Sequence, residues 1–136
     1  MTSTLFRPVG LQELALIFDS GIREFPPRLA HQPIFYPVLD RNYAIQIARD
    51  WNSLDEGSGF AGFVTRFKLV SSYLERFEPQ TVGSTSHVEL WIPAEQLGEF
   101  NATIQEPIDV VSAYFGPAFK SWVPESFGLR GQDAVQ

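Results

Sequence analysis

The segment that most constrains this chain is residues 87–93, which read HVELWIP. Aliphatic side chains occupy every second position of the segment, so it predicts a strand with one apolar face and places Glu89 on the other face. His87 lies two residues earlier and therefore shares the face of Glu89. A carboxylate in such a strand costs desolvation energy unless something pairs with it. Taken alone, Glu89 also fits a solvent-exposed strand position, because charged side chains mostly lie in water.

Two other predicted strands carry side chains that are suited to binding. Arg7 lies in a strand predicted for residues 4–9, and its planar guanidinium suits phosphate or ribose oxygens. Tyr36 lies in a strand predicted for residues 34–38, and its ring offers a face on which a flat heterocycle stacks. Taken singly, Arg7 also fits a surface arginine whose aliphatic stem packs on a neighbouring side chain. Tyr36 also fits a tyrosine in the core or at its rim. Only the three segments together indicate a binding site.

The residues that build common catalytic and metal sites are few. The chain has no cysteine, and its two histidines, His31 and His87, have no supporting Asp or Cys spacing. We therefore expect no metal site, no thiol nucleophile and no disulfide. Neither a Gly-x-Ser-x-Gly elbow nor a glycine-rich phosphate loop with its lysine is present. His87 alone fits a surface strand histidine as well as a residue that positions a substrate or shuttles a proton.

The composition predicts one globular domain in 136 residues. Hydrophobic residues make up 44% of the chain and aromatic residues 14%, which is enough to fill a core and still line a pocket for a flat ligand. We expect residues 1–116 to form the domain and residues 117–136 to form a partly ordered C-terminal extension that is frayed from residue 131 onward.

The charge and the hydropathy pattern narrow the choice of partners. A formal net charge of −6 disfavours a broad nucleic-acid surface, which needs clustered Lys and Arg side chains. No apolar run reaches membrane-spanning length, and the N-terminus has no apolar signal core. We therefore expect no membrane partner and a cytoplasmic location.

Short strands and helices follow one another without strict alternation, which predicts an α+β domain and not a doubly wound α/β fold. Asp40 is the predicted N-cap of the second helix, and Gly21 is the predicted stop of the first. We expect the apolar stripe of the second helix, which ends in Trp51, to pack on the core. Residues 22–33 form a proline-containing loop, and residues 78–86 form a polar loop. The predicted elements are strands at residues 4–9, 34–38, 60–70, 87–93 and 108–114 and helices at residues 11–20, 41–52, 71–77 and 93–101.

This order of segments resembles that of the ADP-ribosyltransferase superfamily, over roughly residues 5–114. Residues 5–11, which read LFRPVGL, resemble its first motif, a strand that ends in His or Arg before an amphipathic helix. Residues 34–36 resemble its second motif, in which a strand precedes a helix with alanines one turn apart, here at positions 44 and 48. Residues 87–93 resemble its third motif, the strand that carries the catalytic Glu.

The resemblance implies a split β-sheet with short helices and a cleft that takes NAD as substrate. Glu89 would bind a hydroxyl of the nicotinamide ribose and support the oxocarbenium-like state as nicotinamide leaves. Arg7 would contact NAD in its ribose–phosphate region, and Tyr36 would stack near the nicotinamide. His87 would act beside Glu89 in the catalytic strand and help to select the acceptor, which residues 78–86 would face. The acceptor itself stays open among a protein, a nucleic-acid base, a small molecule and water.

The chain departs from the superfamily pattern at two places. Subfamilies pair His with Tyr or Arg with Ser in the first two motifs, whereas Arg7 with Tyr36 mixes the two pairs. His87 stands where Gln or Glu is common. A second hypothesis is therefore a non-catalytic module that binds a nucleotide or a peptide in the same cleft. A third, a relative of the RNA 2′-phosphotransferases, is disfavoured by the acidic charge.

The chain also resembles small uncharacterised bacterial proteins that carry the label "ADP-ribosylation/crystallin J1". That label implies ADP-ribosylglycohydrolases, which are much larger, all-helical proteins that use paired Asp clusters on magnesium. The sequence contains nothing of that kind, so we do not expect that activity.

Overall fold

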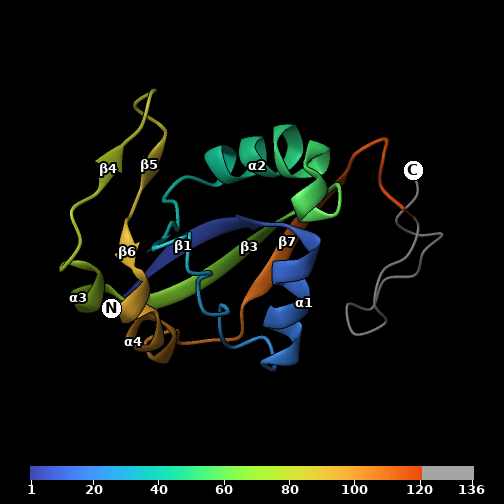
Figure 1. The fold of residues 1–136 in the computed structure, drawn as a ribbon. Helices are drawn as coiled ribbons and strands as arrows, with labels where there is room; N and C mark the ends of the chain where they lie inside the picture. Colours follow the sequence, from blue (N-terminus) through green and yellow to red (C-terminus); the bar gives the residue numbers. More distant parts are fainter. Residues whose placement is uncertain (121–136) are drawn as a thin grey trace.

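The computed structural model describes residues 1–120, and the fraying predicted for residues 131–136 lies outside them. The fold is α+β, with small antiparallel sheets and short helices, as predicted (Figure 1). The strands are β1 Thr2–Val9, β2 Ile34–Phe35, β3 Ala61–Val70, β4 Gln80–Thr81, β5 Val88–Glu89, β6 Ile92–Pro93 and β7 Asp109–Phe115. The helices are α1 Leu11–Asp19, α2 Arg41–Asp50, α3 Ser71–Leu74 and α4 Leu97–Ala102, with 3-10 turns η1 Asn52–Leu54, η2 Glu56–Ser58 and η3 Ala94–Gln96.

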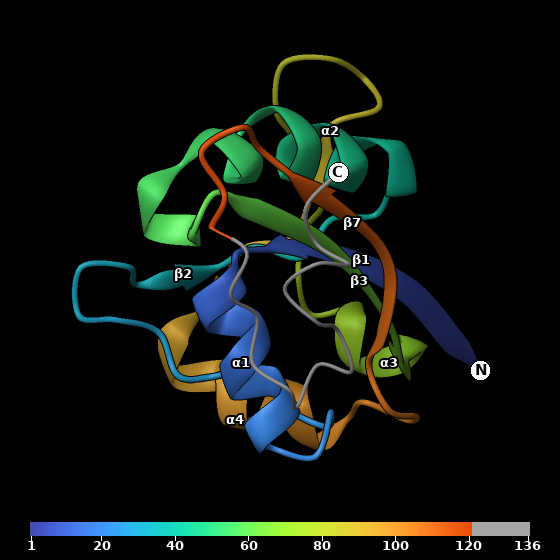
Figure 2. The ribbon, with the colours of Figure 1, turned by 90° about the vertical axis from the view of Figure 1, so that its right-hand side faces the viewer.

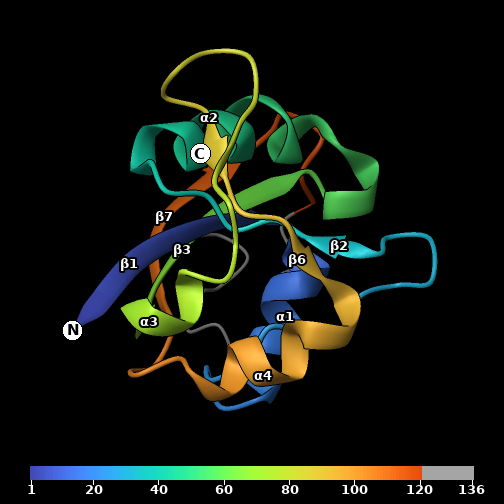
Figure 3. The ribbon, with the colours of Figure 1, turned by 90° about the vertical axis from the view of Figure 1, so that its left-hand side faces the viewer.

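The central sheet has the antiparallel strand order β1-β3-β7. Helix α2 covers one face of this sheet, and α1, α3 and α4 lie on the other side (Figures 2 and 3). The alternation of side chains along β3 explains the two covered faces. Phe63, Phe67 and Leu69 belong to the larger core, whereas Val64 packs in a smaller core with Ala44 and Ala48 of α2.

The edge of β1 continues the sheet toward the part of the chain that carries Glu89. Phe6 of β1 forms an antiparallel bridge with Val38, and Val38 forms a second bridge with Glu89. The amide of Val38 donates to the Phe6 carbonyl at 2.7 Å, and the Phe6 amide donates to the Val38 carbonyl at 2.9 Å. Strand β5 then pairs with β4, while β2 pairs with β6. Three segments that are distant in the sequence are therefore neighbours.

Aromatic rings form a large part of the core within residues 1–120. Five phenylalanine rings are almost fully buried. Four of them pack with one another in tilted and edge-to-face pairs with ring centroids 4.8 to 6.0 Å apart, and Phe63 packs edge-to-face on Phe115 at 5.8 Å. The five buried rings are Phe25, Phe35, Phe63, Phe67 and Phe100. A few large apolar side chains instead stay exposed, among them Tyr36 and Trp91 beside the Glu89 strand.

Local signals in the sequence set the ends of the two longer helices, and both predictions are confirmed. The carboxylate of Asp40 accepts a 2.9 Å hydrogen bond from the backbone amide of Tyr43 and so caps α2. Helix α1 ends at Gly21, which has a φ of +82°, and the amide of Ile22 donates to the carbonyl of Ile17. This is a Schellman ending, in which a residue without Cβ takes the left-handed conformation.

Three expectations about local structure were wrong. The segment at residues 87–93 is not one strand, because β5 pairs with β4 and Val38, whereas β6 pairs with β2. The predicted loop at residues 78–86 contains β4, which the pairing with β5 creates. Trp51 is 73% exposed and not packed on the core, because α2 ends at Asp50. Within residues 1–120, none of the helices has the length and apolar character needed to cross a membrane.

Candidate functional site

Three of the four predicted site residues line one pocket, which we call the Glu89 cleft. Its volume is about 470 Å³, and it is lined by Arg7, Arg28, Tyr36, Asn52, Glu89 and Trp91 together with aliphatic side chains. The size lies within the usual range for small-molecule sites. The bridges from Phe6 through Val38 to Glu89 explain the convergence, because they place the Arg7, Tyr36 and Glu89 segments side by side.

The carboxylate of Glu89 is held by two donors. The Tyr43 hydroxyl donates to Oε2 at 2.9 Å, and the indole Nε1 of Trp91 donates to Oε1 at 2.8 Å. Each carboxylate oxygen has a further lone pair, so Glu89 keeps the capacity to accept a hydrogen bond from a ligand. Glu89 is half-buried, and its orientation is therefore fixed while one side still faces the cleft.

Sequence reasoning missed Tyr43, as it missed Arg28 and Trp91. Tyr43 follows the capping residue Asp40 by three positions, so the cap fixes the backbone from which the phenol reaches Glu89. Burial, and then the hydrogen bond to Glu89, raise the pKa of Tyr43 to about 12. The phenol is therefore a protonated donor at neutral pH. Its position beside the buried Ala44 of α2 is the one signal in the sequence that could have placed it near the sheet.

Arg7 is built into the wall of the cleft. It is 8% exposed, and its Nε and Nη2 donate to the two carboxylate oxygens of Glu13 at 2.7 and 2.9 Å. A third donor, Nη1, bonds to the Tyr36 carbonyl at 3.2 Å. The guanidinium carbon also lies 4.5 Å from the centroid of the Phe35 ring. Arg7 thus joins α1 to the segment that carries Tyr36, and Glu13 is its fork-to-fork partner.

Two exposed aromatic rings stand at the rim of the Glu89 cleft. Tyr36 is 40% exposed and Trp91 is 46% exposed, and their ring centroids lie 6.4 Å apart in an edge-to-face arrangement. Both residues line the cleft. Exposed rings on a polar pocket offer apolar faces on which a flat ligand stacks.

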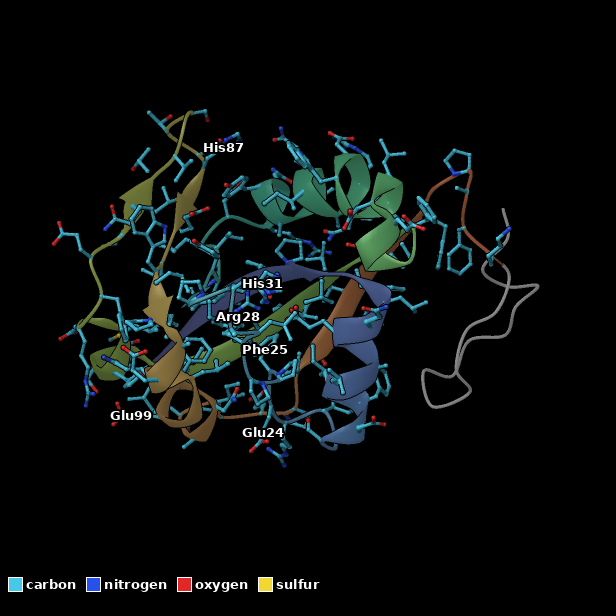
Figure 4. All side chains as sticks on the ribbon, in the orientation of Figure 1. Glu24, Phe25, Arg28, His31, His87 and Glu99 are labelled. Atoms are coloured by element: carbon cyan, nitrogen blue, oxygen red, sulfur yellow. The ribbon has the colours of Figure 1, made fainter. Side chains whose placement is uncertain are left out.

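Arg28 comes from the loop at residues 22–33 and lines the same cleft; its label lies near the middle of the view in Figure 4. Its Nε donates to the Ile34 carbonyl at 3.1 Å, and its guanidinium carbon lies 5.9 Å from the Phe35 ring centroid. Burial and the neighbouring Arg7 charge lower the pKa of Arg28. The loop thus brings a second cation to a site where the first already has a carboxylate partner.

His87, the fourth predicted site residue, lies outside the Glu89 cleft. Its ring stacks on Tyr43 with the centroids 4.2 Å apart and the planes 10° apart. It lines a neighbouring hollow of about 540 Å³, the His87 pocket, together with Tyr43, Trp51 and Asp55. Figure 4 shows His87 at the far end of the β4–β5 hairpin, well above Arg28. Ile47 and Asn52 line both the His87 pocket and the Glu89 cleft, so the two hollows adjoin.

A third hollow, of about 600 Å³, lies between the start of α1, the loop at residues 22–33 and the turns η1 and η2. We call it the loop pocket. Arg7, Arg28 and Asn52 line both the loop pocket and the Glu89 cleft, which makes the two a continuous depression. Among residues 1–120, no group of three or more His, Cys, Asp or Glu side chains is placed to hold a metal ion.

The chain matches no protein-family model, no curated protein and no solved structure at a significant level. We therefore infer the function from the geometry of the Glu89 cleft and the chemistry of its side chains.

Proposed function

We propose that the Glu89 cleft binds NAD and that Glu89 supports cleavage of the bond between nicotinamide and ribose. One observation carries the proposal: a fixed carboxylate, an arginine and an aromatic ring from three distant segments line one cleft of small-molecule size. The split-sheet arrangement of the ADP-ribosyltransferase superfamily is part of the same proposal.

The chemistry requires stabilisation of a cationic sugar. As nicotinamide departs with the electron pair of the bond, positive charge develops on the ribose carbon, and a carboxylate held in advance stabilises this charge without reorganisation. Glu89 meets this need, because Tyr43 and Trp91 hold both of its oxygens. In this proposal Glu89 accepts a hydrogen bond from a ribose hydroxyl, and Tyr36 and Trp91 flank the nicotinamide.

The His87 pocket is the place that we assign to the acceptor. It adjoins the Glu89 cleft through Ile47 and Asn52, and Tyr43 stands between them with its hydroxyl on Glu89 and its ring on His87. An acceptor there would approach the ribose carbon from the side of the β4–β5 hairpin. The acceptor class stays open among protein, nucleic-acid base, small molecule and water.

The test is release of free nicotinamide from NAD, measured by chromatography for the wild type and for Glu89→Gln. The substitution keeps the size of the side chain and removes its charge, so we expect release to fall by about 100-fold or more. Glu95→Gln is the matched control, because Glu95 is an exposed carboxylate outside the cleft, and it should leave release unchanged. Equal release by the wild type and Glu89→Gln would remove Glu89 from the mechanism.

Calorimetric titration with NAD in the same samples distinguishes the second candidate, a non-catalytic binding module. The pairing of Arg7 with Glu13 favours this candidate, because Nε and Nη2 of Arg7 already donate to Glu13 and are not available to NAD. In the superfamily, the residue at this place contacts NAD. Binding of NAD without nicotinamide release would support the module, and absence of binding would overturn both the reaction and a module that binds NAD.

A further inference from the structure

Two guanidinium groups, those of Arg7 and Arg28, line both the Glu89 cleft and the loop pocket, and the nearby carboxylate of Glu13, which lines the loop pocket, pairs with only the first of them. The guanidinium carbons of Arg7 and Arg28 lie 4.5 and 5.9 Å from the centroid of the same Phe35 ring. Glu13 bonds to Arg7 through both of its oxygens. The charged side chains that act on Arg28 are Arg7, which lowers its pKa, and Glu13, which raises it. Among residues 1–120, Arg28 therefore has no ion-pair partner of its own.

The terminal nitrogens of Arg28 are free to bind. Its Nε is anchored to the Ile34 carbonyl, which orients the planar group, and within residues 1–120 the structure gives its two Nη atoms no hydrogen-bond partner. A half-buried guanidinium with two unused donor nitrogens beside a like charge is relieved by an anion that accepts in a forked geometry. Phosphate groups have that geometry and that charge.

Arg28 also stands where two hollows meet. It lines the Glu89 cleft on one side and the loop pocket on the other. A ligand with one end beside Glu89 and the other end in the loop pocket passes Arg28 with its middle. A dinucleotide has its diphosphate in that position.

We propose that Arg28 is the anion-binding residue of this site and that it takes the diphosphate of a nucleotide ligand that extends into the loop pocket. Arg7 is then a positioning residue, which fixes the Tyr36 segment and α1 and leaves the ligand's negative charge to Arg28. The identity of the ligand as NAD rests on the proposed function, but the demand for a diphosphate at Arg28 does not.

The experiment measures the affinity for ADP and for adenosine by calorimetry, in the wild type and in Arg28→Gln and Arg28→Lys. We expect Arg28→Gln to weaken ADP binding by about 10-fold or more and adenosine binding by less than 2-fold, because only ADP carries the anion. Arg28→Lys keeps the charge without the fork and should give an intermediate loss. Arg23→Gln, an exposed arginine of the same loop outside the cleft, should bind ADP like the wild type.

A measurement on the wild type keeps the test valid if Arg28→Gln fails to fold. Addition of inorganic pyrophosphate should shift the Arg28 Nε–H resonance in a nitrogen-correlated NMR spectrum, while that of Arg23 stays in place. Equal ADP affinity in the wild type and Arg28→Gln, no ADP binding at all, or an unmoved Arg28 resonance overturns the inference.

The experiments distinguish failure of the proposed anion site at Arg28 from failure of the proposed cleavage of NAD. ADP binding that depends on Arg28, without nicotinamide release, supports the anion site and removes the proposed reaction. Nicotinamide release with the same KM for NAD in the wild type and Arg28→Gln supports the reaction and removes the anion site.

Discussion

The hydroxyl of Tyr43 donates a 2.9 Å hydrogen bond to Oε2 of Glu89 and so ties helix α2 to strand β5. The same tyrosine ring stacks on His87, two residues before Glu89. One side chain therefore contacts both residues that the sequence assigns to catalysis, and it reaches them from a helix that the cap Asp40 begins. The orientation of the Glu89 side chain therefore depends on how helix α2 packs as well as on the backbone of strand β5.

Replacing Tyr43 with Phe removes the hydroxyl and keeps the ring that stacks on His87. We expect the kcat for nicotinamide release to fall by about 10-fold, because Glu89 loses one of the two donors that hold it. The KM for NAD should stay within about 2-fold, since the phenol is not a lining group of the Glu89 cleft. Steady-state kinetics on the two proteins provide the measurement. A change confined to KM would mean that Tyr43 contacts the ligand and does not position the carboxylate.

The raised pKa of Tyr43 predicts that its hydroxyl keeps its proton in alkaline solution and that the fold loses stability when this proton is removed. Its pKa of about 12 in the folded protein lies above the ordinary value of 10.0, so the folded state holds this proton more tightly than the unfolded state. The linked stability is fully present below pH 10 and is lost as the pH rises from about 10 to 12. NMR of ring-labelled tyrosine should find Tyr43 still protonated at pH 11. A Tyr43 ring that is mostly ionised at that pH would contradict the hydrogen bond to Glu89.

The sequence predicts the elements whose causes are local. Asp40 caps α2 and Gly21 ends α1 because the deciding contacts lie within five residues of each signal. The β4–β5 hairpin is also local, but its strands have two residues each, too short for the sequence pattern to reveal β4 within the predicted loop at residues 78–86. Its attachment to the central sheet is distant, because Glu89 bridges to Val38, about 50 residues before β5, and no pattern within a short window carries that information.

Removal of the Glu13 charge should destabilise the fold. In Glu13→Gln the nearly buried guanidinium of Arg7 loses its bidentate partner, and breaking such a pair costs about 3 kcal/mol. Urea unfolding should show a lower midpoint at an unchanged slope. Glu99→Gln is the matched control, because the Arg76–Glu99 pair has side chains that are 57% and 52% exposed and should contribute less than about 1 kcal/mol. Equal losses for the two variants would show that the burial of Arg7 does not matter.

The candidate site could be predicted only in part, and the reason is the same distinction between local and distant contacts. The face of Glu89 follows from alternation along the strand, and its side chain does line a cleft. The partner of Arg7 does not follow from any motif, because Glu13 reaches it only after α1 folds back beside β1. In the sequence Arg28 is not distinguished from Arg23, the other arginine of its loop, because the contacts that orient it come from Ile34 and Phe35 in the folded protein. Sequence order thus indicated which segments meet, and the contacts between them decide which side chains stay available.

Replacing Gly62 of β3 with Ala tests whether the site depends on the close packing of α2 against the central sheet. A Cβ at this position would overlap the backbone carbonyl of Ala48, which cannot move without shifting the helix. We expect Gly62→Ala to lower the free energy of unfolding by about 2 kcal/mol, the usual cost of overpacking. Because α2 carries Tyr43, nicotinamide release should also fall at temperatures where the variant remains folded. The control is Gly98→Ala in α4, where an added Cβ meets no atom within 4 Å. Because alanine favours the helix more than glycine does, this substitution should leave the free energy of unfolding unchanged or raise it. If Gly62→Ala is as stable as the wild type, α2 can slide on the sheet, and the hydrogen bond from Tyr43 to Glu89 cannot be a fixed feature of the site.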